Sequence, residues 1–404
     1  MASRSAARTA EAAAVPAGDW FTADLARVLG AASVWGSAFS TFYLLPKFLA
    51  QELGAGPSEI GLAVGIFPIA TVAATPFAGW VVDRFPRRYA MVAGAAVMAL
   101  AAAGFLGVRR LGPFLDALRA LQGLSYALVV TAVGTLVADV VPRARLNQAL
   151  GLSGASMLVM NAVAPAAAEP LAAAAGWPAV FAAASIAAAT ATVLAAGVRE
   201  PAWARAAGAR GGLRALLAQP VARHYGLVVA LSGAAFGAVF TFEPAHALAL
   251  GRTRVGGFFI AYACAAIAVR VGLGSLPARL GSYRVARTAL ALYALVVLAL
   301  AGVGAGGLEP LGALFGLAHG LFYPAINAIA VAAVRRHERG RMIAVFTGAF
   351  SAGLAGGSTL LGYVAVWGGY PAVFVVAACG AAVALVLLRV SPALSAAGRA
   401  MEVG

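Results

Sequence analysis

The sequence predicts an all-α integral membrane protein whose twelve transmembrane helices form two six-helix halves. Three observations lead to this prediction. Of the 404 residues, 62% are hydrophobic and 11% are charged, whereas a soluble domain carries about a quarter charged residues. The mean hydropathy is +0.91. Apolar stretches of membrane-spanning length occur twelve times, and motifs of the first six return in the last six.

A more polar connector separates the apolar stretches into two groups. The first group covers 27–50, 58–82, 89–108, 114–140, 147–172 and 177–198. The second group covers 222–249, 255–278, 285–306, 310–334, 342–365 and 370–390. We therefore predict an N-terminal tail over 1–26, a first bundle over 27–198, a connector over 199–221, a second bundle over 222–390 and a C-terminal tail over 391–404.

The distribution of basic residues predicts the orientation in the membrane. If both termini are cytoplasmic, the cytoplasmic segments hold 22 of the 29 Lys and Arg residues, the opposite face holds 5, and the apolar stretches hold the remaining 2, Arg119 and Arg270. Cytoplasmic loops carry such an excess of Lys and Arg. We expect a multi-pass protein of a bacterial-type inner (plasma) membrane with both termini in the cytoplasm.

An internal repeat relates the two groups of stretches. Gly176-Trp-Pro-Ala-Val-Phe181 returns as Gly369-Tyr-Pro-Ala-Val-Phe374, which is 193 residues later. The same shift aligns Gly123-Leu-Ser-Tyr126 with Gly316-Leu-Ala-His319. Agreement in shift between separate motifs indicates two halves of parallel orientation, as in transporters built from repeats.

The loop between the second and third stretches concentrates charge. Asp83, Arg84, Arg87 and Arg88 lie within six positions, four residues after Gly79. Such a cluster cannot sit in hydrocarbon, so it marks a turn at a membrane face. Because an acid adds nothing to a positive-inside signal, Asp83 indicates a gating contact with a helix N-terminus of the other half. The alternative is an ordinary topological signal.

One arginine of the first half lies well inside an apolar stretch. A charged Arg119 near mid-membrane costs at least about 2.5–3.5 kcal/mol, so it must face protein or water. We interpret it as a functional residue. The alternative is a structural ion pair with Asp116, one helical turn away.

A second polar set lies in the apolar stretches of the second half. It consists of Glu243, His246, Arg270 and His319. Glu243 and His246 are three residues apart and share a helix face, and a histidine changes charge near neutral pH. As a set facing one cavity they are candidates for coupling or substrate binding; for each histidine alone, a packing role is the alternative.

These motifs resemble those of the major facilitator superfamily. The charged loop after Gly79 is similar to that family's helix 2–3 loop motif, with Pro86 in place of a glycine. Arg119, Gln122 and Gly123 resemble its helix 4 motif, and Asp139 matches the usual exit from that helix.

Two further stretches can be compared with particular branches of that family. The helix 5 motif of the drug/proton antiporters matches poorly, because Ala164-Pro165 replaces Gly-Pro and Ala168-Glu169 replaces paired glycines. The stretch from Phe258 to Arg270 resembles a sugar-efflux-like bacterial branch.

The resemblance implies roles for named residues. Asp83 would contact the start of helix 11, and Arg87 would pair with Asp139, in contacts that form in the outward-open state and break as the cytoplasmic side opens. Arg119, with Gln122, would serve proton coupling or bind an anionic substrate group. We expect Glu169, near the outer end of helix 5, to lie at the membrane interface.

The resemblance implies a secondary active transporter that moves a small solute by alternating access, through proton-coupled efflux by antiport. Proton-coupled uptake by symport is the alternative, and a non-transporting sensor or scaffold is the alternative from another class. The sequence contains no phosphate-binding Gly-x-x-x-x-Gly-Lys loop, zinc-ligand pattern or nucleophile elbow, so we expect no enzyme, cofactor or metal. The expected partners are a small-molecule substrate, protons and the lipid bilayer; dispersed arginines argue against nucleic acid, and we expect a monomer.

Overall fold

The computed structural model describes residues 21–141, 145–200, 219–273, 276–334 and 339–390, which are almost entirely helical. The first half comprises α2 (Ala23–Thr41), α3 (Leu45–Glu52), α4 (Pro57–Arg84), α5 (Arg87–Gly104), α6 (Pro113–Val140) and α7 (Leu146–Ala196). The second half comprises α9 (Pro220–Ala249), α10 (Gly256–Gly272), α11 (Leu276–Leu280), α12 (Ser282–Ala301), α13 (Leu308–Ala332) and α14 (Arg339–Val390). Short 3-10 turns join α2 to α3 (Phe42–Leu44), follow α5 (Phe105–Gly107) and precede α13 (Ala305–Gly307).

The helices supply twelve crossing segments. Nine helical spans of the described residues are long and apolar enough to cross a membrane, and the apolar α10 is shorter. Two of the nine, Gln148–Ala196 and Val345–Val390, contain 49 and 46 residues, about twice what one crossing requires. Counting each of these as two segments gives the predicted twelve. Residues 1–20 of the predicted N-terminal tail, most of the predicted connector and the predicted C-terminal tail lie outside the described residues. Helix α2 begins at Ala23, within the last residues of the predicted N-terminal tail.

The two double-length helices turn back at equivalent glycines. Gly176 in α7 has φ 78° and Gly369 in α14 has φ 69°, a left-handed conformation that glycine adopts without steric cost. Each is followed after one residue by a proline, Pro178 or Pro371, which suits the first turn of the next helix. The repeat found in the sequence is therefore a repeated interhelical turn.

One predicted boundary is wrong. The stretch expected over 255–278 ends earlier, because α10 stops at Gly272 and α11 is a separate short helix. Gly272, Gly274 and Pro277 are poor residues for the interior of a helix.

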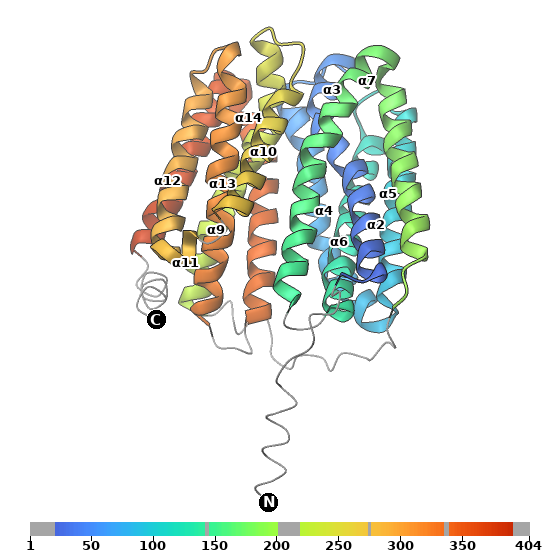
Figure 1. The fold of residues 1–404 in the computed structure, drawn as a ribbon. Helices are drawn as coiled ribbons and strands as arrows, with labels where there is room; N and C mark the ends of the chain where they lie inside the picture. Colours follow the sequence, from blue (N-terminus) through green and yellow to red (C-terminus); the bar gives the residue numbers. More distant parts are fainter. Residues whose placement is uncertain (1–20, 142–144, 201–218, 274–275, 335–338, 391–404) are drawn as a thin grey trace, which may run out of the picture.

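The halves lie side by side, the first on the right of Figure 1 and the second on the left. We name the two ends of the bundle after Asp83 and Lys47. The Asp83 end holds the start of α2 and the end of α14, and the Lys47 end holds the turns at Gly176 and Gly369.

Large apolar side chains such as Leu100 and Val193 are exposed, at 70% and 73%. Exposed apolar side chains of this kind suit contact with lipid.

The halves pack closely at the Lys47 end. Gly61 of α4 lies directly against the carbonyl oxygen of Ser358 in α14. A Cβ on Gly362 of α14 would lie 2.8 Å from the carbonyl oxygen of Pro57 in α4. Glycine is required at both positions because any side chain would collide with backbone.

The Asp83 end contains open space instead. A Cβ added to Gly79 or Gly134 of the first half, or to Gly348 of the second, would meet no atom within 4 Å. The space lies between the halves, because Gly134 of α6 and Thr347 of α14 line one cavity.

Candidate functional site: a cavity between the two halves

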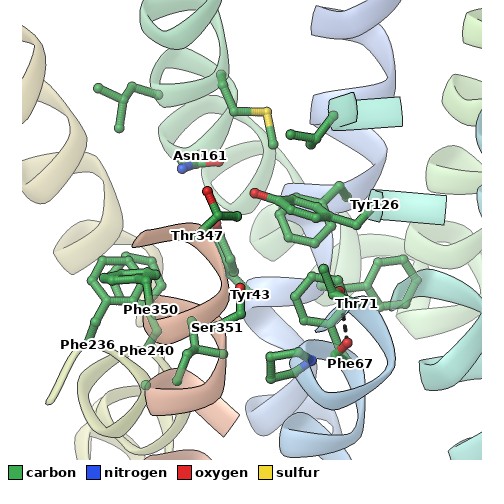
Figure 2. A pocket seen from close by; sticks show the side chains of 18 of the residues that line it. Tyr43, Phe67, Thr71, Tyr126, Asn161, Phe236, Phe240, Thr347, Phe350 and Ser351 are labelled. Atoms are coloured by element: carbon green, nitrogen blue, oxygen red, sulfur yellow. Dashed lines mark hydrogen bonds between the residues drawn. The ribbon is translucent and has the colours of Figure 1, made fainter. Parts of the chain in front are cut away.

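A cavity of about 500 Å³ lies between the halves. Both halves contribute to its wall, through α2, α4, α6 and α7 on one side and α9, α10, α13 and α14 on the other. Figure 2 shows Phe67 and Tyr126 on one side of this space and Phe236, Phe240 and Phe350 on the other. The volume is in the range of small-molecule binding sites.

The repeat contributes matching residues to the cavity. Tyr126 on α6 and His319 on α13 occupy positions related by the 193-residue shift, and both line the wall. The Nδ1 atom of His319 is 2.8 Å from the hydroxyl oxygen of Tyr262 on α10. Asn161 of α7 also lines the cavity, and its side-chain oxygen accepts a hydrogen bond from Ser40 at 2.8 Å.

Arg119 is buried in the wall and bound to helix α4. Its Nε donates to the carbonyl oxygen of Ala63 at 3.1 Å and one Nη to that of Val64 at 3.3 Å. The carbonyl of Val64 is four residues before Pro68, which has no N–H to bond it. The Arg119 guanidinium therefore donates a hydrogen bond to the Val64 carbonyl, which has no N–H partner within α4.

Two further contacts hold the Arg119 guanidinium. Its other Nη donates to the side-chain oxygen of Gln122, and its central carbon lies 5.2 Å from the centre of the Phe67 ring. The described part of the chain contains no ion pair between Arg119 and Asp116, so Asp116 is not its structural partner. The buried Gln122 amide nitrogen has no hydrogen-bond partner among the described residues.

The polar set of the second half is divided between two places. Arg270 and His319 are among the residues that line the cavity, whereas Glu243 and His246 are not. Glu243 is 0% exposed, and neither of its carboxyl oxygens has a hydrogen-bond partner in the described part of the chain. His246 packs against Tyr370 and Phe374. The expectation that all four residues face one cavity is therefore wrong.

The charged loop is organised by a residue that sequence reasoning missed. Arg87 pairs with Asp139, as the resemblance implied. The carboxylate of Glu200 accepts hydrogen bonds from the backbone N–H groups of Arg87 and Arg88, at 3.0 and 3.2 Å, and so caps the first turn of α5. Arg84 is exposed, as is Asp83.

The position of the Arg87–Asp139 pair corrects one expectation. Both residues belong to the first half, and the pair is intact although a cavity lies between the halves toward the Asp83 end. Because it does not cross between the halves, their separation does not break it. Asp83 has no hydrogen bond or ion pair within the described residues, and the residues just before α14, 335–338, lie outside them.

A buried charge pair of the first half binds backbone groups of the second half at the Lys47 end. Lys47 pairs with Glu169, and the Lys47 Nζ also donates to the carbonyl oxygen of Thr253 at 2.6 Å. The Glu169 carboxylate accepts from the backbone N–H groups of Val255 and Gly256 at 2.7 and 2.8 Å. These last two contacts are at the start of α10, where the helix dipole favours negative charge. We call these five residues the latch.

The latch corrects the expectation for Glu169. Its side chain is 10% exposed and that of Lys47 is 9%, so Glu169 is not an interfacial residue. It stands where the resembled antiporter motif has a glycine, and that departure from the motif is the available sequence signal. Gly362, the residue 193 positions later, makes the equivalent close contact between α14 and α4.

The twelve crossing segments, the repeated halves and the cavity between them define a multi-pass membrane protein of the transporter class. The chain belongs to the major facilitator superfamily, whose family model matches residues 28–310 and 310–402. It is similar to the uncharacterized MFS-type transporter YhhS of Escherichia coli (strain K12) and of Shigella flexneri, with 27% identity over 164 residues. That match spans 40% of this chain and 40% of each relative.

Solved structures share the fold over nearly the whole chain. The nucleoside transporter NupG superposes with a TM-score of 0.77 at 11% identity, covering 93% of this chain and 99% of its own. The human organic anion transporter MFSD10 gives 0.66 at 16% identity, with 90% and 99% covered. A bacterial homolog of the human lysosomal transporter Spinster gives 0.69 at 12%, with 96% and 98% covered. These likenesses show the fold alone.

Proposed function

We propose that this chain is a secondary transporter that exports a small solute in exchange for protons, by alternating access of the cavity between the halves. The observation that carries the proposal is the cavity itself, walled by both halves. Its wall contains the buried Arg119 and an Arg270 that has no ion pair among the described residues. Proton-coupled uptake uses the same parts and remains the second candidate. A sensor or scaffold does not require an open cavity with charged groups in its wall.

Alternating access needs two ends that open in turn. In this conformation, latch contacts and close glycine packing join the halves at the Lys47 end, and space remains at the Asp83 end. With the proposed topology, this is the inward-facing conformation. Asp83, exposed here, is then available to bind the start of α14 when the Asp83 end closes.

The proposed coupling centre is Arg119 with Gln122. The cavity wall, as far as the described residues form it, contains no Asp or Glu. The candidates for the group that carries the proton are His319, which lines the cavity, and the buried Glu243 and His246, which do not.

The transport proposal is tested in proteoliposomes loaded with the pH dye pyranine. A thermal-shift screen of sugars, amino acids, drugs and siderophores first identifies a solute that raises the unfolding temperature. Addition of that solute should then move protons across the membrane in proteoliposomes and not in empty liposomes. Transport of the solute without proton movement would contradict proton coupling.

The proposed topology gives a second expected result. Because the cytoplasmic segments hold most of the basic residues, an alkaline phosphatase fused after Gly404 should be inactive, since that enzyme works only outside the cytoplasm. A fusion in the loop at Arg110, on the other end of the bundle, should be active and is the control. Activity of the Gly404 fusion would reverse the topology.

A further inference from the structure

We propose that the cavity binds an organic anion with a planar aromatic body, and that Arg270 holds the acidic group. This inference rests on the proposed function in taking the cavity as the transport site. It goes further in naming the chemical class of the solute and the residue that selects it.

The charge of the wall is the first step. The charged side chains that line the cavity are Arg119 and Arg270, and the described lining residues include no Asp, Glu or Lys. A cationic solute would meet two like charges in a site partly shielded from water, where charge interactions are strengthened. An anionic solute would meet two opposite charges.

The two arginines are not equally available. Arg119 is 4% exposed and is engaged by Ala63, Val64 and Gln122. Arg270 is half-buried and has no hydrogen bond or ion pair within the part of the chain that the structure describes. Its guanidinium therefore keeps its donors free for a carboxylate or sulfonate, which it can bind through two parallel hydrogen bonds.

Arg270 also reaches the other half. Its Nη1 atom lies 3.5 Å from the position that a Cβ on Gly154 would occupy. Arg270 is on α10 and Gly154 is on α7, so an anion bound there lies between helices of the two halves, whose relative position changes when access changes. The absent side chain of Gly154 leaves the space for the acidic group.

The remaining wall suits an aromatic body. Phe236 and Phe350 lie with ring centroids 5.4 Å apart on the second half, and Phe39 and Tyr126 lie 5.1 Å apart on the first. All four line the cavity, and Figure 2 shows Tyr126 facing Phe236 and Phe350 across it. Aromatic rings bind a planar apolar solute by stacked or edge-to-face contacts.

The test uses three naphthalenes that differ in one group: 2-naphthoate, 2-naphthamide and 2-naphthylmethylammonium. Binding to the purified full chain in nanodiscs is measured by isothermal titration calorimetry. We expect the naphthoate to bind at least tenfold more tightly than the amide, and the ammonium compound to show no binding. Equal affinity for the naphthoate and the amide, or binding of the ammonium compound, would overturn the proposal.

Variants assign the effect to Arg270. Arg270→Gln should weaken naphthoate binding at least tenfold without changing amide binding, and Arg270→Lys should lose less. Arg389→Gln, an exposed site with the same loss of charge, is the control and should bind as the parent does. Unchanged naphthoate binding in Arg270→Gln, with an unchanged unfolding temperature, would contradict the assignment.

The binding experiment and the proton-transport experiment can give opposite results, so failure of one proposal can be distinguished from failure of the other. Binding of the naphthoate needs no movement of protons, so it would stand even if the proteoliposomes showed no coupling. Proton-coupled movement of a neutral or cationic solute would have the opposite meaning, because it would support transport and overturn the anion site.

Discussion

Arg119→Ala is expected to reduce proton-driven transport to the level of empty liposomes while the protein still inserts and folds. The guanidinium is the buried cation of the cavity wall, and its removal leaves no charge at that point of the first half. A fixed positive charge there attracts anionic groups. In antiport, the substrate and the proton compete for one site near this charge. Loss of the charge should remove that competition.

The structure also sets the expected effect on stability. The carbonyl of Val64 loses its donor, and an unsatisfied buried acceptor costs about 1–3 kcal/mol. Insertion becomes easier, because an arginine inside the membrane costs at least about 2.5–3.5 kcal/mol. We therefore expect a modest decrease in unfolding temperature and normal amounts of protein in the membrane.

Arg119→Lys separates charge from geometry. Lysine keeps the positive charge but not the planar fork that reaches Ala63, Val64 and Gln122 together. We expect partial transport, between that of the parent and that of Arg119→Ala. Arg110→Ala, which removes an exposed arginine outside the cavity, is the control for charge loss and should transport normally.

Two outcomes would contradict the coupling role of Arg119. Full proton-driven transport by Arg119→Ala would make the residue dispensable. Loss of transport through failed insertion would make it a brace between α6 and α4. In that case His319, Glu243 and His246 become the residues to vary.

The fold followed from local features of the sequence. Spanning stretches are read from composition, and the repeat of the two halves from a hexapeptide that begins at Gly176 and again at Gly369. The structure shows that each copy forms a turn, since glycine and proline set the backbone conformation locally. The start of α10 was predicted within one residue, but its end was not. Two glycines and a proline near 272–277 interrupted a stretch whose hydropathy continues.

The site was predicted less completely, and the reason is physical. Arg119 was recognised as costly in hydrocarbon, but its partners are backbone carbonyls, which have no side-chain signature. Pro68 is the one residue that indicates a free carbonyl nearby. The contact of Glu169 with Val255 crosses 86 residues of sequence and depends on how two distant helices meet. An acid near a helix end has the same local sequence whether it faces water or another helix.

Loss of the latch should move the molecule toward the conformation that is open at the Lys47 end. In Glu169→Gln, Lys47 remains buried without a charged partner, and removing one partner of a buried ion pair costs about 3–5 kcal/mol. This cost falls on the closed conformation, since separation of the halves exposes Lys47 to water. With about 1.4 kcal/mol for each tenfold change, we expect the ratio of the two conformations to change a hundredfold or more.

The measurement is a distance between spin labels on the two halves. Cysteines replace the exposed residues Glu52 and Arg254 at the Lys47 end, after Cys264 and Cys379 have been changed to serine. Double electron–electron resonance should show a longer distance in Glu169→Gln than in the parent. Glu309→Gln is the matched control, because the Arg252–Glu309 pair also lies within one half but is partly exposed, and Glu309 makes no such bond to the other half among the described residues. The same distances in Glu169→Gln and Glu309→Gln would show that the latch does not hold the halves together.

Asp83→Asn tests the opposite end in the same experiment. If Asp83 binds the start of α14 when the Asp83 end is closed, its neutralisation should destabilise that conformation by about 1 kcal/mol, the size of a charge effect at a helix terminus. Combined with Glu169→Gln, it should restore part of the shorter distance, by roughly fivefold in the ratio of conformations. The two substitutions then act in opposite directions, which a general loss of stability would not produce. If Asp83→Asn changes neither the distance distribution nor transport, the charged loop is a topological signal and the gate at that end lies elsewhere.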